Sequence, residues 1–231
     1  MTRDDILAEL GLTPRWRLRI EARAAQPAGQ VAGTELTDRT ARISRLAWSA
    51  LAADIDACTA CGLCRTRNMS VPGVGDAAAE WLFVGEAPGA EEDARGEPFV
   101  GQAGRLLDNM LAALGLARDR NVFIANVLKC RPPNNRTPEP LEAEACRPYL
   151  ERQIELISPK LIVALGRSAA SLLLGTDATI ASLRGRVHRY RGRPLIVTYH
   201  PAYLLRNLTD KSKAWEDLLL ARSTVAQSAV I

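Results

Sequence analysis

The sequence predicts an α/β protein, a three-layer α/β/α sandwich around a central sheet of four parallel strands. Four short apolar runs, rich in β-branched residues, are expected to form strands at residues 81–85, 122–128, 161–166 and 195–199. Near-continuous apolar runs of this kind suit a parallel sheet that is covered on both faces. Helical segments alternate with the strands, and this alternation predicts right-handed crossovers.

The helices are expected where apolar residues recur at helical spacing. They cover residues 43–57, 103–116, 139–157, 168–175 and 213–226. Residues 1–50 are predicted to form a helical extension, with a linker rich in Pro, Gly, Ala and Thr at residues 25–37. Residues 51–231 are predicted to form the main domain.

Length and charge limit the class of protein. The chain has 231 residues and a formal net charge of +4. A chain of this length buries a substantial core, and a small basic excess is compatible with a polyanionic partner. The polar start, MTRDDILAEL, does not resemble a signal peptide, and no apolar run is long enough to span a bilayer. We therefore expect a soluble, cytoplasmic protein without a membrane partner.

The cysteines predict a metal or cluster site rather than a disulfide framework, because their number is odd and three of them are closely spaced. Cys58 and Cys61 form a chelating pair, Cys130 follows the second predicted strand, and Cys146 lies on the next helix. Four thiolates from two distant segments can bind Zn²⁺ or an iron–sulfur cluster, and the spacing does not distinguish the two. Cys64 is either a competing ligand or a spare thiol.

The functional site is expected at the carboxyl ends of the strands, where sites of such sheets gather. Four stretches end strands there: GEAPG (85–89), ANVLKC (125–130), LGRS (165–168) and YHPAYLLRN (199–207). His200, in the last of them, is a candidate catalytic histidine because it directly follows a strand. The alternative is a purely structural role.

The stretch GEAPGAEEDARGEPFVG (85–101) is rich in glycine, which is typical of phosphate-binding turns. Its charges argue against a phosphate, because five acidic residues face a single basic one. The charged residues are Glu86, Glu91, Glu92, Asp93, Arg95 and Glu97. The loop is therefore expected to meet a neutral or cationic group.

A second stretch, SLRGRVHRYRGRP (182–194), has five arginines, His188 and no acidic residue. It is predicted to be a solvated basic hairpin or loop. Contact with nucleic-acid phosphates and simple surface charge are both compatible with it.

Several motifs together resemble the family 4 uracil-DNA glycosylases. They are GEAPGAEEDARGEPFVGQAGRLL, NVLKCRPPNNRTP, HPAYLLRN and the cysteine set, in the family's order over roughly residues 55–225. The resemblance implies the uracil-DNA glycosylase fold and a [4Fe–4S] cluster on Cys58, Cys61, Cys130 and Cys146. It implies a monomeric, monofunctional enzyme that hydrolyses the N-glycosidic bond of uracil in single- or double-stranded DNA and so initiates base excision repair.

The resemblance also implies roles for pocket residues. Phe99 stacks on the flipped uracil, and Asn126 reads its N3–H and O4 edge. His200 donates a hydrogen bond toward O2 as the departing uracil becomes anionic. Backbone groups of residues 86–88 contact the base.

Position 87 departs from better-known uracil glycosylases, which carry an Asp directly before Pro88. Ala87 offers no carboxylate, so Glu86 and Glu92 are the candidates for placing water or stabilising the sugar cation. Glu86 is assigned to the support of catalysis. Glu92 is assigned to water placement or to the shape of the pocket.

DNA contacts are expected around the pocket. The residues assigned to them are Gly101, Gly104, Lys129, Arg131, Arg136, Leu204 and Arg206. The glycine amides open a helix and suit a phosphate, as do the cationic side chains. Leu204 is expected to enter the space that the base vacates, unless Leu204 and Leu205 only pack their loop.

Two alternatives to an enzyme remain. A related group of proteins traps uracil-DNA covalently with a histidine in a basic insert after the second strand, but KCRPPNNRTPEP contains no histidine. The other alternative is a non-catalytic iron–sulfur module that binds nucleic acid within a repair or replication assembly.

Overall fold

The computed structural model describes residue 5, residue 9 and residues 38–228. The chain divides into two units, Met1–Asp38 and Arg39–Ile231. The predicted extension and linker therefore lie, up to residue 37, almost entirely outside the described residues. Residues 39–50, which we assigned to the extension, belong to the second unit, where Ile43 is fully buried.

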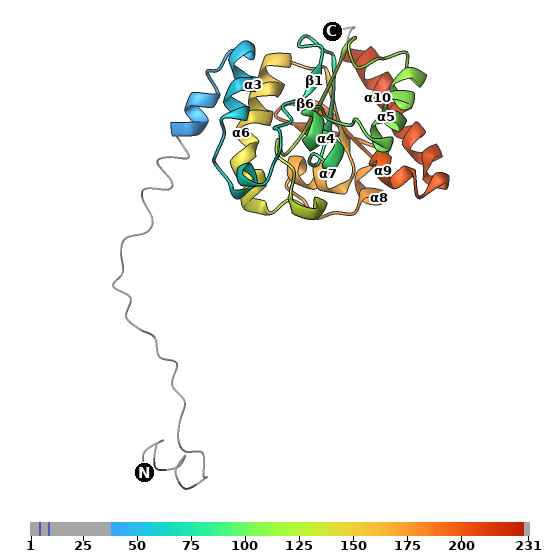
Figure 1. The fold of residues 1–231 in the computed structure, drawn as a ribbon. Helices are drawn as coiled ribbons and strands as arrows, with labels where there is room; N and C mark the ends of the chain where they lie inside the picture. Colours follow the sequence, from blue (N-terminus) through green and yellow to red (C-terminus); the bar gives the residue numbers. More distant parts are fainter. Residues whose placement is uncertain (1–4, 6–8, 10–37, 229–231) are drawn as a thin grey trace. The chain divides into compact units, whose positions relative to one another are not determined.

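The second unit is built on a mixed sheet of six strands in the order β1-β3-β2-β4-β6-β5 (Figure 1). The four central strands run parallel to one another, which confirms the predicted sheet. They are β2 (Trp81–Gly85), β3 (Val122–Asn126), β4 (Leu161–Leu165) and β6 (Arg193–Thr198).

Two antiparallel edge strands were not predicted. Strand β1 (Val74–Gly75) has only two residues, too few for any periodic pattern. Strand β5 (Val187–Tyr190) lies in the basic stretch and alternates exposed and half-buried residues. It forms a hairpin with β6, so the basic stretch is a hairpin, as expected.

Helices cover both faces of the sheet because successive strand residues point to opposite faces. In β2, Leu82 and Val84 share an apolar cluster with α6 (Pro140–Ile157) and α7 (Arg167–Leu174). Trp81 and Phe83 share another with α5 (Gln102–Ala113) and α10 (Lys211–Ser228). Figure 1 shows α6 on one side of the sheet and α5 and α10 on the other. The three-layer α/β/α architecture is confirmed.

The remaining helices are short or peripheral. They are α3 (Trp48–Asp56), α4 (Ala90–Arg95), α8 (Ile180–Leu183), α9 (Pro201–Leu204) and the 3₁₀ turns η1 (Gly62–Arg65), η2 (Pro133–Asn135) and η3 (Leu208–Asp210). Among the described residues, none of the helices is both long and apolar enough to cross a membrane.

Helix α3 packs against α6 and so brings the Cys58–Cys64 segment to the body of the fold. Leu51 and Ile55 of α3 form a buried cluster with Tyr149 of α6. The Tyr149 hydroxyl donates to the Asp54 carboxylate at 2.7 Å, and the Arg39 guanidinium lies 5.0 Å from the centre of the Tyr149 ring. Packing between elements far apart in the chain therefore decides where the first cysteines lie.

Candidate active site

The carboxyl ends of β2, β3 and β6 open onto one cavity of about 500 Å³. Its lining includes nine residues that the sequence singled out: Glu86, Ala87, Pro88, Glu92, Phe99, Asn126, Arg136, His200 and Arg206. The end of β4 does not line this cavity. Parallel strands explain the convergence, because their carboxyl ends meet at one edge of the sheet.

Asn126, the last residue of β3, has an amide oxygen without a partner. The residue is 2% exposed, and its Oδ1 atom accepts no hydrogen bond from the described part of the chain. Gly85 makes room for it, since a Cβ atom at position 85 would lie 2.3 Å from Oδ1 and 2.7 Å from Cζ of Phe99. An unpaired buried acceptor is costly, so this site favours a ligand that brings a donor.

Phe99 is held in a conformation that aromatic residues rarely adopt. Its φ angle is 56°, in the left-handed region. The Arg118 guanidinium secures it by donating to the carbonyl oxygens of Pro98, at 2.8 Å, and of Phe99. Gly104 is equally necessary, because a Cβ atom there would lie 1.6 Å from the Phe99 oxygen. The ring stacks against that of His200 with 5.5 Å between centroids.

His200 is oriented as a neutral hydrogen-bond donor. Its Nδ1 atom accepts from the Ala202 N–H at 3.1 Å, which caps the first turn of α9. Burial, aided by the charge of Arg206 and opposed by that of Glu92, lowers the pKa of His200 to about 4. At neutral pH the ring therefore carries its single proton on Nε2, where it can be donated.

The carboxylates of the acidic loop differ in their hydrogen-bond partners. Glu92 accepts hydrogen bonds from the backbone N–H groups of Gly89 (3.1 Å), Val100 (3.0 Å) and Gly101 (3.4 Å). Asp93, 1% exposed, accepts from the backbone and the side chain of Asn68. Glu92 and Asp93 therefore hold loops in place.

Glu86 differs from both. Its carboxylate lines the cavity and makes no hydrogen bond or ion pair with any residue that the structure describes. It is thus the acidic side chain of this cavity that is available to a ligand or a water molecule.

Two of the expected DNA contacts do not fit the structure. Lys129 is 1% exposed and donates to the Asn126 carbonyl oxygen and to Gln153 inside the protein. Leu204 is also 1% exposed and packs with Tyr199 and Ala214. Both lie in segments that follow a strand, Lys129 in a loop and Leu204 at the end of α9, but their side chains turn inward, which sequence position does not reveal.

The other expected contacts differ in availability. Arg206 is exposed at the rim of the cavity, and Arg131 donates to Asn135. The Gly101 N–H is directed at Glu92, and Gly104 is buried against Phe99. Arg136 lines the cavity but forms an ion pair with Glu142 at 2.6 Å.

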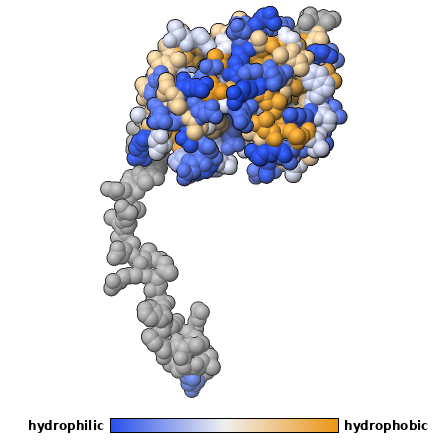
Figure 2. Space-filling view, turned by 45° about the vertical axis from the view of Figure 1, so that its right-hand side comes forward, coloured by the Kyte–Doolittle hydropathy of each residue, from blue (hydrophilic) through white to orange (hydrophobic). Residues whose placement is uncertain are grey.

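The face that carries α9 and α10 includes exposed apolar side chains. Figure 2 shows apolar patches among hydrophilic ones on the side turned forward, where α5, α9 and α10 lie in Figure 1. Leu205 is 38% exposed, directly after the buried Leu204. Leu205 therefore has the accessibility that a DNA wedge requires and Leu204 lacks.

The basic hairpin is mostly occupied by contacts within the protein. Tyr190 pairs with Arg193, so the turn of the hairpin lies at the amino end of β6, away from the cavity. Arg191 forms an ion pair with Glu151 at 2.8 Å, and Arg193 donates to the Pro159 carbonyl. These contacts favour structural surface charge over nucleic-acid contact for this turn.

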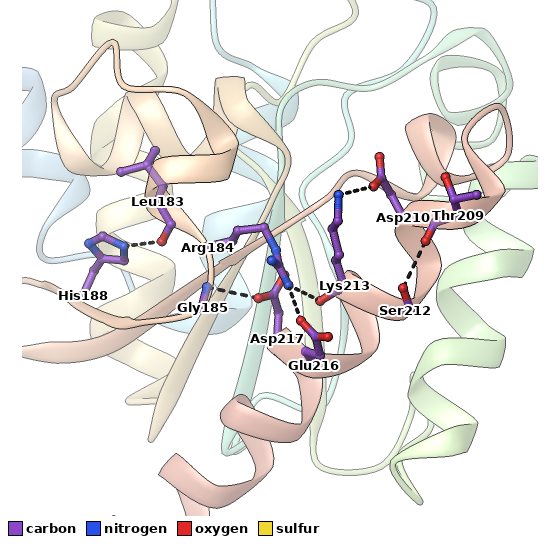
Figure 3. A network of polar contacts seen from close by, with 10 residues as sticks. All are labelled: Leu183, Arg184, Gly185, His188, Thr209, Asp210, Ser212, Lys213, Glu216 and Asp217. Atoms are coloured by element: carbon purple, nitrogen blue, oxygen red, sulfur yellow. Dashed lines mark hydrogen bonds and ion pairs between the residues drawn. The ribbon is translucent and has the colours of Figure 1, made fainter.

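The other end of the hairpin anchors α10, as Figure 3 shows. Arg184 forms ion pairs with Asp217, which is fully buried, and with Glu216, both at 3.1 Å. Asp210 accepts from Lys213 at 2.8 Å and from the Tyr203 hydroxyl at 2.7 Å. The network braces the segment that carries Arg206 beside the cavity.

All five cysteines line a second, smaller cavity beside Lys129 and Tyr149. Hydrogen-bond donors already point at three of the sulfur atoms. Arg67 donates to Cys130 at 2.9 Å, Arg39 to Cys58 at 3.5 Å, and the Lys129 N–H to Cys146 at 3.3 Å.

The chemistry of this donor set fits an anionic, sulfur-ligated group. Burial raises the pKa of Cys146 to about 12 and raises those of Cys61 and Cys130, so burial favours the protonated thiols, and ligation of a metal group requires them to lose their protons. Within the described ranges, no three His, Cys, Asp or Glu residues are arranged to hold a single metal ion. Thiolates from two separate segments can bind either Zn²⁺ or an iron–sulfur cluster.

Comparison with known proteins establishes the family to which the chain belongs. Residues 72–219, well over half of the chain, match the model of the Uracil DNA glycosylase superfamily, so the chain is a member of that superfamily. A type-4 uracil-DNA glycosylase of Archaeoglobus fulgidus is 50% identical over 160 residues, 66% of this chain and 80% of that protein. One from Thermotoga maritima is 46% identical over 172 residues, 73% and 89% of the two chains. Within the superfamily, the chain belongs to the type-4 uracil-DNA glycosylases.

Sequence reasoning missed the residues that support the site. Arg118 holds Phe99 from far along the chain, and Arg67 and Arg39 approach the cysteines in the same way. Nothing in the local sequence distinguishes these arginines from surface ones. Gly85 and Gly104 do carry a signal, since both lie within the motifs that the sequence singled out.

Proposed function

We propose that this chain is a monofunctional DNA glycosylase that removes uracil from DNA by hydrolysing the N-glycosidic bond after base flipping. This reaction initiates base excision repair. The observation that carries the proposal is the buried, unpaired Oδ1 of Asn126 beside the Phe99 ring in a cavity large enough for a base. Uracil brings a donor, its N3–H, to that oxygen, whereas cytosine presents an acceptor at N3. The names of the type-4 relatives agree with this reaction.

His200 is proposed to stabilise the leaving group. Negative charge develops on the uracil as the bond breaks, and a preorganised donor at O2 counters it. The capped Nδ1 leaves the Nε2 proton for this task. A neutral imidazole suits it because the ring needs no change of protonation before it donates.

Glu86 is proposed to place the attacking water or to stabilise the positive sugar. Support comes from its carboxylate at the cavity wall, which has no hydrogen bond or ion pair to the described residues, since Ala87 supplies no carboxylate. Glu92 is proposed to shape the pocket, because its two oxygens already receive three backbone N–H groups. Exchanging each for Gln separates the two: Glu86→Gln should slow excision without loosening the fold, and Glu92→Gln should lower the melting temperature as well. Equal excision by Glu86→Gln and the unaltered protein would remove Glu86 from the mechanism.

Cys58, Cys61, Cys130 and Cys146 are proposed to hold a [4Fe–4S] cluster, with Cys64 outside the set. The four ligands join the segment after α3 to β3 and α6, so the cluster supplies a structural cross-link. Arg67 and Arg39 then act as donors to its ligating sulfurs.

DNA is proposed to lie across the rim of the cavity, with Arg206 and Arg131 at its phosphates and backbone N–H groups at the start of α5 nearby. Leu205 is proposed as the side chain that fills the vacated space. We further propose that the protein acts as a monomer in the cytoplasm, at the nucleoid, on single- or double-stranded substrate.

The test is incubation with a uracil-containing single-stranded oligonucleotide, followed by alkali. Strand breaks together with free uracil are expected. A denaturation-resistant protein–DNA band would identify a trapping protein instead, and binding without either product would identify a non-catalytic module. A brown preparation with visible thiolate–iron absorption is expected, and a colourless, zinc-loaded one would overturn the cluster.

A further inference from the structure

Lys129 lies between the base pocket and the cysteine cavity, and the proposed mechanism does not use it. Its side chain is 1% exposed although lysine is seldom fully buried. The ammonium donates to the Asn126 carbonyl oxygen at 2.8 Å and to Oε1 of Gln153 at 2.6 Å. Gln153 is oriented by its own bond to the Pro72 carbonyl, at 2.7 Å.

The charge of Lys129 has no carboxylate partner in the described part of the chain. A buried charge requires compensation. Lys129 also borders the second cavity: it adjoins Cys130 in the chain, and its backbone N–H donates to the sulfur of Cys146 at 3.3 Å. Once the sulfurs of both cysteines ligate the proposed cluster as thiolates, Lys129 becomes the buried counter-charge between that site and the pocket.

The orientation of Asn126 depends on the hydrogen bond that Lys129 donates to its carbonyl oxygen. Its side-chain oxygen makes no hydrogen bond in the described structure, so no side-chain contact of that atom fixes its direction. Asn126 is the last residue of β3, and its pairing with Gly85 is the last one between β3 and β2. A bond to its carbonyl oxygen therefore acts directly on the backbone that aims the amide.

We propose that Lys129 is a positioning residue that fixes Asn126 for reading the base and couples the pocket to the cysteine site. The inference rests on the proposed function. In this proposal Lys129 supports uracil recognition through Asn126, without contacting uracil or DNA itself.

The experiment is a double-mutant cycle in the full-length holoprotein. Lys129→Met keeps an unbranched apolar side chain that matches the stem of the lysine and removes its ammonium donor. We expect it to retain iron and visible absorbance and to slow single-turnover excision about tenfold, with weaker inhibition by free uracil. In an Asn126→Ala background, the same change should have less than about a twofold further effect. Lys160→Met, at a lysine that pairs with Glu80 on the surface, is the matched control and should leave excision unchanged.

Excision by Lys129→Met at the unaltered rate, or an equal loss in the Asn126→Ala background, would overturn the inference. If the Lys129→Met protein loses iron, Gln153→Leu replaces Lys129→Met in the same cycle. The Gln153→Leu change removes one of the two acceptors of the Lys129 ammonium and keeps the lysine. Loss of iron from both would also overturn the inference, since Lys129 would then serve the cysteine site alone. Failure of the unaltered protein to excise uracil would instead refute the proposed function.

Discussion

The base pocket and the cysteine cavity lie on either side of Lys129 and are built in opposite ways. The pocket presents polar atoms without partners in the described chain, namely Oδ1 of Asn126 and the Glu86 carboxylate. The cysteine cavity presents sulfurs that already receive donors from Arg67 and Arg39. Unsatisfied groups suit a ligand that enters and leaves, whereas sulfurs surrounded by donors suit an anionic group that stays.

The largest effect is expected from a change that disrupts the cysteine cavity. Cys146→Ser should abolish iron binding and visible absorbance and lower the melting temperature strongly, because binding of a structural metal group contributes directly to folding. Cys64→Ser is the matched control: it removes a thiol from the same cavity and should retain full iron. Iron retained by Cys146→Ser, or lost from Cys64→Ser, would show that the ligand set is wrong. Iron content and thermal melts provide the measurements.

Next in size is a change that breaks the pocket alone. His200→Ala should slow single-turnover excision by about 10²–10³-fold, the usual cost of removing one donor to a developing anion. Iron content should not change, since His200 lies in the pocket. His188→Ala is the control, because His188 contacts the Leu183 carbonyl away from the cavity. Comparable losses in the two variants would argue against a donor role for His200.

A smaller effect should follow from displacing the aromatic platform. Gly104→Ala places a methyl group 1.6 Å from the Phe99 oxygen, so the ring must move and excision should fall about tenfold or more. Gly115→Ala is the control for the added methyl group: its φ of +76° makes the substitution strained, but no atom lies within 4 Å of that methyl group. It should lower stability by about 1 kcal/mol and leave excision intact. An active Gly104→Ala protein would mean that the position of Phe99 matters little.

The smallest effect concerns pH. Because the pKa of His200 is lowered to about 4, the neutral donor persists down to that pH. The acid limb of kcat/KM should therefore begin near pH 4 instead of near pH 6.5, in samples whose iron content is checked at each pH. Unfolded chains bind the proton below pH 6.5 and the folded protein only near pH 4, so His200 lowers stability as the pH falls between these values. An acid limb near pH 6.5 that is absent from His200→Gln would contradict the lowered pKa.

Much of the fold could be predicted because apolar runs identify buried parallel strands. The run WLFVG coincides with β2, and the other three runs each contain or overlap a central strand. Strand β5 was missed because its alternate residues are exposed, and α4, α8 and α9 because four to six residues are too few to show helical periodicity.

The candidate site was predictable where a residue ends or closely follows a strand and its side chain faces the common edge, as for Asn126 and His200. The same argument misled for Lys129 and Leu204, which lie a few residues further along the same segments but turn into the core. Position along the chain places a residue near the edge of the sheet. The direction of its side chain depends on what packs around it.

The strands of the central sheet, the glycine-rich loops at their ends and the set of cysteines can be read from the sequence, because these depend on local patterns. Which polar groups are satisfied depends instead on how the folded chain brings distant residues together. Arg118 reaches Phe99, Arg67 reaches Cys130 and Lys129 reaches Gln153 across long separations in sequence. A hydrogen bond requires its two atoms to meet in space, so the free carboxylate of Glu86 and the occupied one of Glu92 look alike until the chain has folded.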